Sequence, residues 1–164
     1  MVKEKNLKGL RGWLILVDLG LIVAVIFQLV GVYQSVKLFI DGTISVLSDA
    51  SSTTYIPGFT LWIIYGFIAQ IIIIFASLYL LYLFSQKSKK FPKLYIVFLI
   101  ASLIFILLDY AIWASLSGAT STTQEILKNA QPDLLKSLLR SIVAAIVWGL
   151  YMKKSKRVKA TFVE

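Results

Sequence analysis

The sequence predicts an all-α integral membrane protein, an antiparallel four-helix bundle with both termini on the cytoplasmic side. Three observations lead to this fold class. Four apolar segments are each long enough to cross a bilayer. Hydrophobic residues make up 59% of the chain and the mean hydropathy is +0.84, which is more apolar surface than a water-soluble domain of this size can hide. The basic residues gather at the edges of the apolar segments, and far more of them lie on one side.

The four predicted spans cover residues 13–36, 59–84, 94–116 and 134–152. Each has about 19 to 26 residues, and about 20 helical residues cross a hydrocarbon core of about 30 Å. The segments are apolar on every side and lack the alternation typical of a half-buried strand. The first is longer than the apolar part of a signal peptide, roughly 7–15 residues, so we expect it to remain as a helix. We therefore expect one membrane domain over residues 1–164, with a basic cytoplasmic tail at 153–164.

Two short polar loops are expected on the outer side. The first, residues 37–58, is rich in Ser and Thr and ends in the turn signal Pro57-Gly58. The second, residues 117–131, contains Thr122-x-x-Glu125, a capping box that predicts a brief helix. Pro132 suits the first turn of the fourth span, where its missing N–H is not needed.

The positive charges predict the orientation. One side holds 13 Lys and Arg: Lys3, Lys5, Lys8, Arg11, Lys87, Lys89, Lys90, Lys93, Lys153, Lys154, Lys156, Arg157 and Lys159. The opposite loops hold 3: Lys37, Lys128 and Lys136. The positive-inside rule makes the richer side cytoplasmic. All four tryptophans fall near span ends, as an interfacial aromatic belt requires.

Composition narrows the chemistry. The chain has no Cys and no His, which removes thiol nucleophiles, zinc–thiolate sites and the commonest general base. We expect no catalytic, cofactor-binding or metal-ligating residues and no enzymatic activity. The net charge of +9 lies at membrane edges, so it favours contact with anionic lipid head groups over nucleic acid.

Segments at both ends of the chain carry a family resemblance. Near the start stands Gly9-Leu10-Arg11-Gly12-Trp13-Leu14. Near the end stand Trp148, Tyr151, Ser155, Arg157, Val158, Thr161 and Phe162, with Arg140 eight residues before Trp148. With Phe91-Pro92-Lys93 and Leu107-Leu108-Asp109 between them, these segments resemble the DUF2569 family over nearly the whole chain. The resemblance implies a small four-span protein of a bacterial plasma membrane and no known activity. The family's second span often carries a glutamate, where this chain offers only Gly66 and Gln70.

The candidate polar residues inside the predicted spans are Asp18, Gln28, Gln70, Asp109 and Arg140. A charge at the centre of a spanning helix costs roughly 2.5–3.5 kcal/mol, so each charge needs a partner or water. Asp109 and Arg140 lie at similar depth on neighbouring antiparallel spans, which makes them candidates for an ion pair. The pair would be either a structural clasp or part of a gate or substrate site. For Asp18 the alternatives are contact with the interface or a tyrosine, and proton carriage.

Two further patterns suggest contacts with other molecules. Ser141, Ala145 and Gly149 form a small-residue face that would pack within the bundle or form a homodimer seam. The basic tail would anchor to lipid or dock a partner. We expect a non-enzymatic binding, stabilising or regulatory component of the membrane, with a membrane-protein partner or a homo-oligomer. The alternative is a small transporter or channel subunit that uses the intramembrane polar residues.

Overall fold

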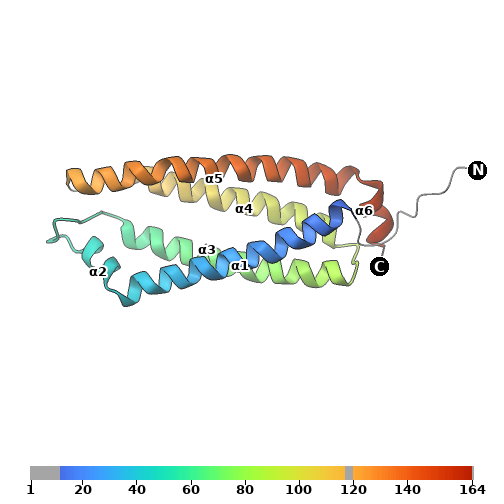
Figure 1. The fold of residues 1–164 in the computed structure, drawn as a ribbon, viewed down its shortest axis with the longest axis horizontal. Helices are drawn as coiled ribbons and strands as arrows, with labels where there is room; N and C mark the ends of the chain where they lie inside the picture. The colour runs from blue at the N-terminus through green and yellow to red at the C-terminus, as the bar shows by residue number, and fades with distance from the viewer. Residues whose placement is uncertain (1–11, 117–119, 164) are drawn as a thin grey trace, which may run out of the picture.

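The computed structural model describes residues 12–116 and 120–163, apart from the side chains of residues 122 and 126. The predicted basic segment with Lys3, Lys5, Lys8 and Arg11 lies outside the described residues. The described chain is helical and contains no strand (Figure 1). Its helices are α1 (Trp13–Ile40), α2 (Thr43–Ser48), α3 (Phe59–Ser85), α4 (Phe91–Ser115), α5 (Ser121–Lys154) and α6 (Lys156–Thr161).

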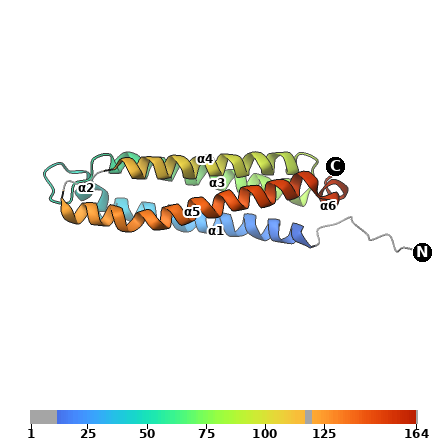
Figure 2. The ribbon, with the colours of Figure 1, turned by 90° about the horizontal axis from the view of Figure 1, so that it is seen from above.

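The four long helices form an elongated antiparallel bundle, as predicted (Figures 1 and 2). All four are long and apolar enough to cross a membrane, so the chain is a multi-pass membrane protein. Helix α1 packs closely against α3, and α4 packs closely against α5. The α3–α4 contact that joins these two pairs is looser. The short helices α2 and α6 lie at opposite ends of the bundle (Figure 1).

The apolar core is divided into two clusters, one at each end of the bundle. The first joins the start of α1, the end of α3, the start of α4, the end of α5 and α6; its most deeply buried members are Leu14, Val17, Leu80, Phe91 and Val158. The second joins α2 to the start of α3, the end of α4 and the start of α5 through Ile44, Ile56, Phe59, Ile63, Trp113 and Leu127. All four long helices contribute to both clusters. The contribution of α1 to the second cluster is Leu38, which is only partly buried.

The middle of the bundle holds few buried residues. In α4 the buried side chains are Phe91, Tyr95 and Trp113, all near its ends. In α1 they are Leu14, Val17 and Leu21 near the start, and Ser35 near the end. Lipid solvates apolar side chains as well as a protein core does, so exposure between the clusters carries no hydrophobic penalty.

Helix α5 corrects the prediction for the second loop and the fourth span. One helix runs from Ser121 to Lys154, where a brief helix and a separate span at 134–152 were expected. Its cap is formed by Thr120 and Thr123, not by the predicted Thr122-x-x-Glu125: Thr120 Oγ1 accepts from Thr123 N at 3.3 Å, and Thr123 Oγ1 accepts from Thr120 N at 3.1 Å. At 1.5 Å per residue its 34 residues span about 51 Å, well beyond a bilayer core of about 30 Å.

Pro132 lies inside α5 and does not start a span. Proline removes one helical hydrogen bond, which would have gone to the carbonyl of Lys128 four residues earlier. Both Pro132 and Lys128 are exposed, so water can solvate the freed carbonyl at the part of α5 that extends past the bilayer core. A proline is therefore tolerated here without a protein group to bond the freed carbonyl, which a proline at mid-membrane would need.

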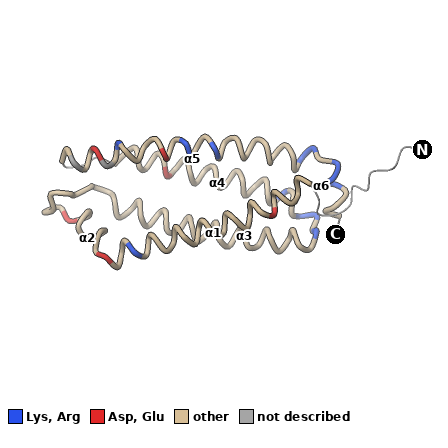
Figure 3. The backbone as a smooth tube through the Cα atoms, viewed as in Figure 1, with Lys and Arg blue, Asp and Glu red and all other residues tan. Residues whose placement is uncertain are grey.

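The two ends of the bundle differ in charge (Figure 3). At the end formed by α6 and the α3–α4 turn, here called the basic end, the described residues include Lys87, Lys89, Lys90, Lys93, Lys153, Lys154, Lys156, Arg157 and Lys159. The opposite end, here called the loop end, mixes Lys37, Lys128 and Lys136 with Asp41, Asp49, Glu125 and Asp133.

Local hydrogen bonds order the loop end. Gly58 precedes α3 with φ +81°, a left-handed conformation that glycine adopts without strain. Hydrogen bonding to Thr43 lowers the pKa of Asp41, and hydrogen bonding from the backbone and side chain of Ser51 lowers the pKa of Asp49. At a pH above the ordinary carboxyl pKa of 3.8, the two ionised carboxylates therefore stabilise the folded loops. This contribution to stability is lost as the pH falls through their lowered pKa values.

Candidate functional site

Asp109 is bound to a tryptophan near the loop end. Its Oδ1 accepts a hydrogen bond from Trp62 Nε1 of α3 at 2.8 Å. The Trp62 ring packs against Trp113 of α4 with ring centroids 4.7 Å apart. One turn away, Tyr65 donates its hydroxyl to the carbonyl of Phe105 at 2.6 Å. These contacts hold α3 against α4 near the loop end of the bundle.

Arg140 lies on a different surface of the bundle. It is exposed on α5 and lines a shallow hollow of about 470 Å³ with Leu139, Val143, Ala144, Val147 and Trp148. Among the described residues the one salt bridge joins Lys136 to Asp133 at 3.1 Å, also on α5.

The predicted Asp109–Arg140 ion pair is therefore not formed. The prediction rested on the similar depth of the two residues in the membrane. Depth gives the position of a residue along the helix axis, and it does not say which way the side chain points around that axis. Leu138 is the buried residue of mid-α5, and at 100° per residue Arg140 lies about 200° around the helix from it. The helical rotation that buries Leu138 thus turns Arg140 outward.

Gln70 lies in the seam between α1 and α3. A Cβ on Gly31 of α1 would come within 3.2 Å of the Gln70 side chain, so the two helices approach closely there. Gln70 Oε1 and Ser77 Oγ are buried and have no hydrogen-bond partner among the described residues. They stand seven residues, or two turns, apart on α3 and so share one face.

Asp18 and Gln28 are partly exposed on α1. Within the described chain, neither makes a hydrogen bond or an ion pair. Arg11, the basic residue one heptad before Asp18, lies outside the described residues. Tyr82 is the tyrosine that the sequence places at a depth similar to that of Asp18, on the second span. It is 59% exposed and makes no bond to Asp18 in the described part of the chain. The intramembrane polar residues thus lie on several separate contacts and surfaces.

The small-residue face of α5 makes no close helix contact at Gly149 within the described chain. Ser141, Ala145 and Gly149 are partly exposed, and a Cβ on Gly149 would meet no atom within 4 Å. Ser141 donates its hydroxyl to the carbonyl of Ser137 in its own helix at 2.9 Å. The predicted close packing is therefore not formed at Gly149. At 100° per residue, the three residues lie on the same side of α5 as buried Leu138.

The tail folds back onto the bundle through the residues that carry the family resemblance. Val158 is 1% exposed and Phe162 is 6% exposed. The Phe162 ring stacks on Phe91 at 4.8 Å and contacts Phe84 at 5.6 Å. Ser155 Oγ caps α6 by accepting from Val158 N at 3.4 Å, and Thr161 is buried as well.

Trp148, near the end of α5, contacts α1. Trp148 packs against Trp13 of α1 with centroids 6.0 Å apart and against Tyr151 at the same distance. Arg157 is partly exposed on α6. Apart from such basic side chains, the tail packs into the cluster at the basic end. Sequence reasoning missed this role, although the apolar spacing of Val158 and Phe162 indicates one buried helix face.

No metal centre is built from the described residues, because no three His, Cys, Asp or Glu side chains gather there. A family model described as "Protein of unknown function (DUF2569)" matches residues 7–163. Comparison with curated proteins and with solved structures found no match.

Proposed function

Because the chain belongs to the DUF2569 family, whose function is unknown, we propose its role from the geometry: it is a non-enzymatic membrane component that binds another membrane protein through the outward face of α5. The observation that carries this proposal is Arg140, an exposed charge at membrane depth without an ion-pair partner in the described chain. The composition supports the non-enzymatic part, since His and Cys are absent.

The depth of Arg140 favours a partner. Arg140 precedes Lys153, which lies at the basic interface, by 13 residues or about 20 Å. In a core of about 30 Å, Arg140 is then about 10 Å from the opposite face. A lone charge at such depth costs up to about 3 kcal/mol. An acidic or hydrogen-bonding side chain on a partner helix would offset this cost.

The surroundings of Arg140 suit a helix. Ala144 lies one turn further along the same hollow. Small residues let a second helix approach closely, and Val143 and Val147 add apolar contact area. The partner is either a different membrane protein or a second copy of this chain.

Site-specific photocrosslinking in native membranes tests the proposal. A photoreactive residue at Val143, which is 60% exposed, should give a discrete protein adduct, and Arg140→Ala should abolish it while Arg140→Lys retains part of it. A photoreactive residue at Phe75 on α3, 68% exposed, is the matched control and should give only lipid adducts. Equal lipid labelling at both positions would refute binding through α5.

A transporter or channel subunit is the second candidate, and one observation favours it. The unpaired polar atoms of Gln70 and Ser77 lie about 10 Å apart along the α1–α3 seam, where water could bind them. Flux of protons, ions or amphiphiles into proteoliposomes, reduced by Gln70→Leu, would support this candidate. Flux equal to that of empty liposomes would remove it.

We also propose that the basic end faces the cytoplasm of a bacterium and that the chain resides in the plasma membrane. The support is the charge difference between the two ends of the bundle (Figure 3). Positive residues in short loops are retained on the cytoplasmic side. This orientation places α6 and the α3–α4 turn inside the cell.

A further inference from the structure

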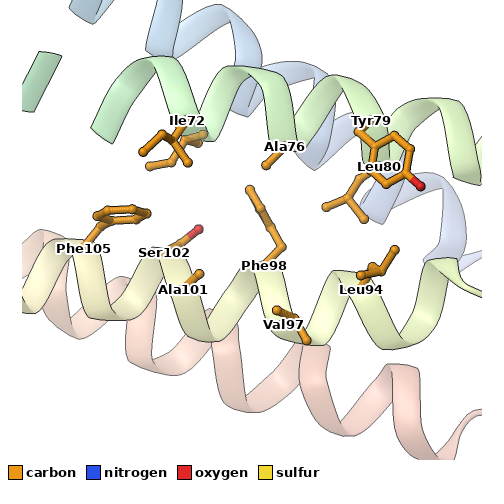
Figure 4. A pocket seen from close by; sticks show the side chains of 11 residues that line it. Ile72, Ala76, Tyr79, Leu80, Leu94, Val97, Phe98, Ala101, Ser102 and Phe105 are labelled. Atoms are coloured by element: carbon orange, nitrogen blue, oxygen red, sulfur yellow. The ribbon is translucent and has the colours of Figure 1, made fainter. Parts of the chain in front are cut away.

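A hollow of about 200 Å³ separates α3 from α4 between the points where the two helices touch (Figure 4). At the basic end, Phe84 and Phe91 hold the helices together with ring centroids 5.1 Å apart. At the loop end, the Trp62–Asp109 hydrogen bond does so. Between these contacts the lining includes the small residues Ala76, Ala101 and Ser102, which leave the space unfilled.

The hollow opens to the bilayer. Its rim residues Ile72, Tyr79 and Val97 are 46%, 51% and 58% exposed. Phe98 points from α4 toward Ala76 across the hollow, and the rest of the lining is almost entirely apolar (Figure 4). Leu94 and Phe105 at the two ends of the lining are eleven residues apart, or about 16 Å, close to the half-thickness of a bilayer core of about 30 Å. The lining therefore matches the depth of the acyl chains of one leaflet.

Two lysines stand at the mouth of this hollow. On a helix, residues four apart lie on one face. Lys90 begins the row Leu94, Phe98 and Ser102, and the Leu94 N–H bonds to the Lys90 carbonyl at 3.0 Å, so the helical spacing extends back to the lysine. Lys93 begins the parallel row Val97 and Ala101.

The charge at the mouth is not neutralised within the described chain. Lys90 and Lys93 are exposed, and neither forms an ion pair among the described residues. They lie at the N-terminus of the 25-residue helix α4, where the helix dipole adds further positive potential. Lys87 and Lys89 of the adjoining turn add to it. An anion at this mouth would thus meet cationic groups on several sides.

We infer that the α3–α4 hollow binds an anionic phospholipid of the leaflet at the basic end, with an acyl chain in the hollow and the phosphate on Lys90 and Lys93. A helix with its side chains is about 10–12 Å across, so a partner helix cannot enter a space of this volume, whereas part of an acyl chain fits. The lysine stems can lie along the apolar rows while their ammonium groups reach the head-group region. The inference is independent of partner binding through α5.

Native mass spectrometry of the full chain tests the head-group contact. The protein in detergent micelles is offered phosphatidylglycerol and phosphatidylcholine with identical acyl chains. We expect a preference for phosphatidylglycerol that falls about thirtyfold in Lys90→Gln/Lys93→Gln, since each lysine near an anionic surface contributes roughly fivefold. Lys153→Gln/Lys154→Gln removes the same charge from the end of α5 and should leave most of the preference. Equal binding of the two lipids, or an equal loss in both variants, would overturn the inference.

Two experiments test the acyl-chain contact. Ala101→Leu fills the hollow and should weaken both lipids alike, whereas Ala111→Leu, on an exposed part of the same helix, should not. Phosphatidylglycerol with a photoreactive acyl chain needs no variant and should label residues 94–105 of the unaltered protein most strongly. Labels spread evenly over the four long helices would refute a lipid site.

Discussion

The position of Phe162 predicts that one substitution releases the tail without unfolding the bundle. Its ring is 6% exposed and contacts Phe84 and Phe91. Truncating a buried Phe to Ala lowers the free energy of unfolding by about 3–5 kcal/mol. We use the lower value here because a site near a terminus can relax. Helix α6 has six residues, too few to be stable without tertiary contacts. A loss of about 3 kcal/mol raises the population with an open tail somewhat more than a hundredfold.

Limited proteolysis measures this opening. Trypsin cuts after Arg157 and Lys159, which α6 protects when docked. When opening is fast relative to cleavage, the rate follows the open population, so Phe162→Ala should be cut about a hundredfold faster at these sites. Val163→Ala, at a 53% exposed neighbour, is the control and should behave as the unaltered chain does. Equal cleavage rates for Phe162→Ala and the control would show that the Phe162 contacts do not hold the tail.

Three other predictions follow from the same contacts. Trp62→Phe should cost about 1–2 kcal/mol in detergent, and a double-mutant cycle with Asp109→Ala, which removes the acceptor, should show coupling; strictly additive losses would mean that the hydrogen bond contributes nothing. Gly31→Leu should overpack the α1–α3 seam by about 1–3 kcal/mol, whereas Gly149→Leu should change stability by less than about 0.5 kcal/mol; the reverse order in thermal unfolding would contradict the observed spacing. Because the chain has no Cys, a single cysteine at Lys89 should resist impermeant reagents in intact cells while one in α2 reacts, and labelling of position 89 from outside would reverse the orientation.

The spans could be predicted from sequence because lipid imposes one strong condition. Every backbone polar group in the core must be bonded internally, so a long apolar segment can only be a helix. Three of the four spans begin and end within a few residues of their predicted bounds. The fourth was cut short because Pro132 and the polar residues before it are typical of a loop. Outside the core, capping and solvent let such residues continue the helix.

The contacts of the polar residues could not be predicted in the same way. Depth follows from counting residues, but the face of a helix that meets its neighbour depends on packing. The apolar spans are hydrophobic all round, so they carry little amphipathic signal to show which face is inside. Asp109 therefore matched Arg140 in height and yet bonds Trp62. The nearness of Trp62 to the outer end of its span was visible in the sequence, and it offered an indole donor at the depth of Asp109.

The small-residue rule had the same weakness. Spacing of four identifies residues that can permit close approach, and it does not say which helix uses them. Gly149 has open space beside it, whereas the tight contact forms at Gly31, whose neighbour Gln70 was noted only for its polarity. A glycine opposite a long polar side chain is a complementary pair, but recognising it requires the register of α1 against α3.

The distribution of packing links the fold to the proposed roles. Most of the deeply buried apolar side chains lie at the two ends of the bundle. The pair α1–α3 is joined to the pair α4–α5 mainly at these ends. In water, the exposed sides between the ends would drive aggregation, but in a bilayer they are solvated. Binding at these sides is then decided by shape and polar groups, which here are the hollow below Lys90 and Lys93 and the surface around Arg140. Since these surfaces contribute little to the core, substitutions on them should alter binding while the bundle stays folded, so a loss of lipid or partner can be separated from a loss of structure.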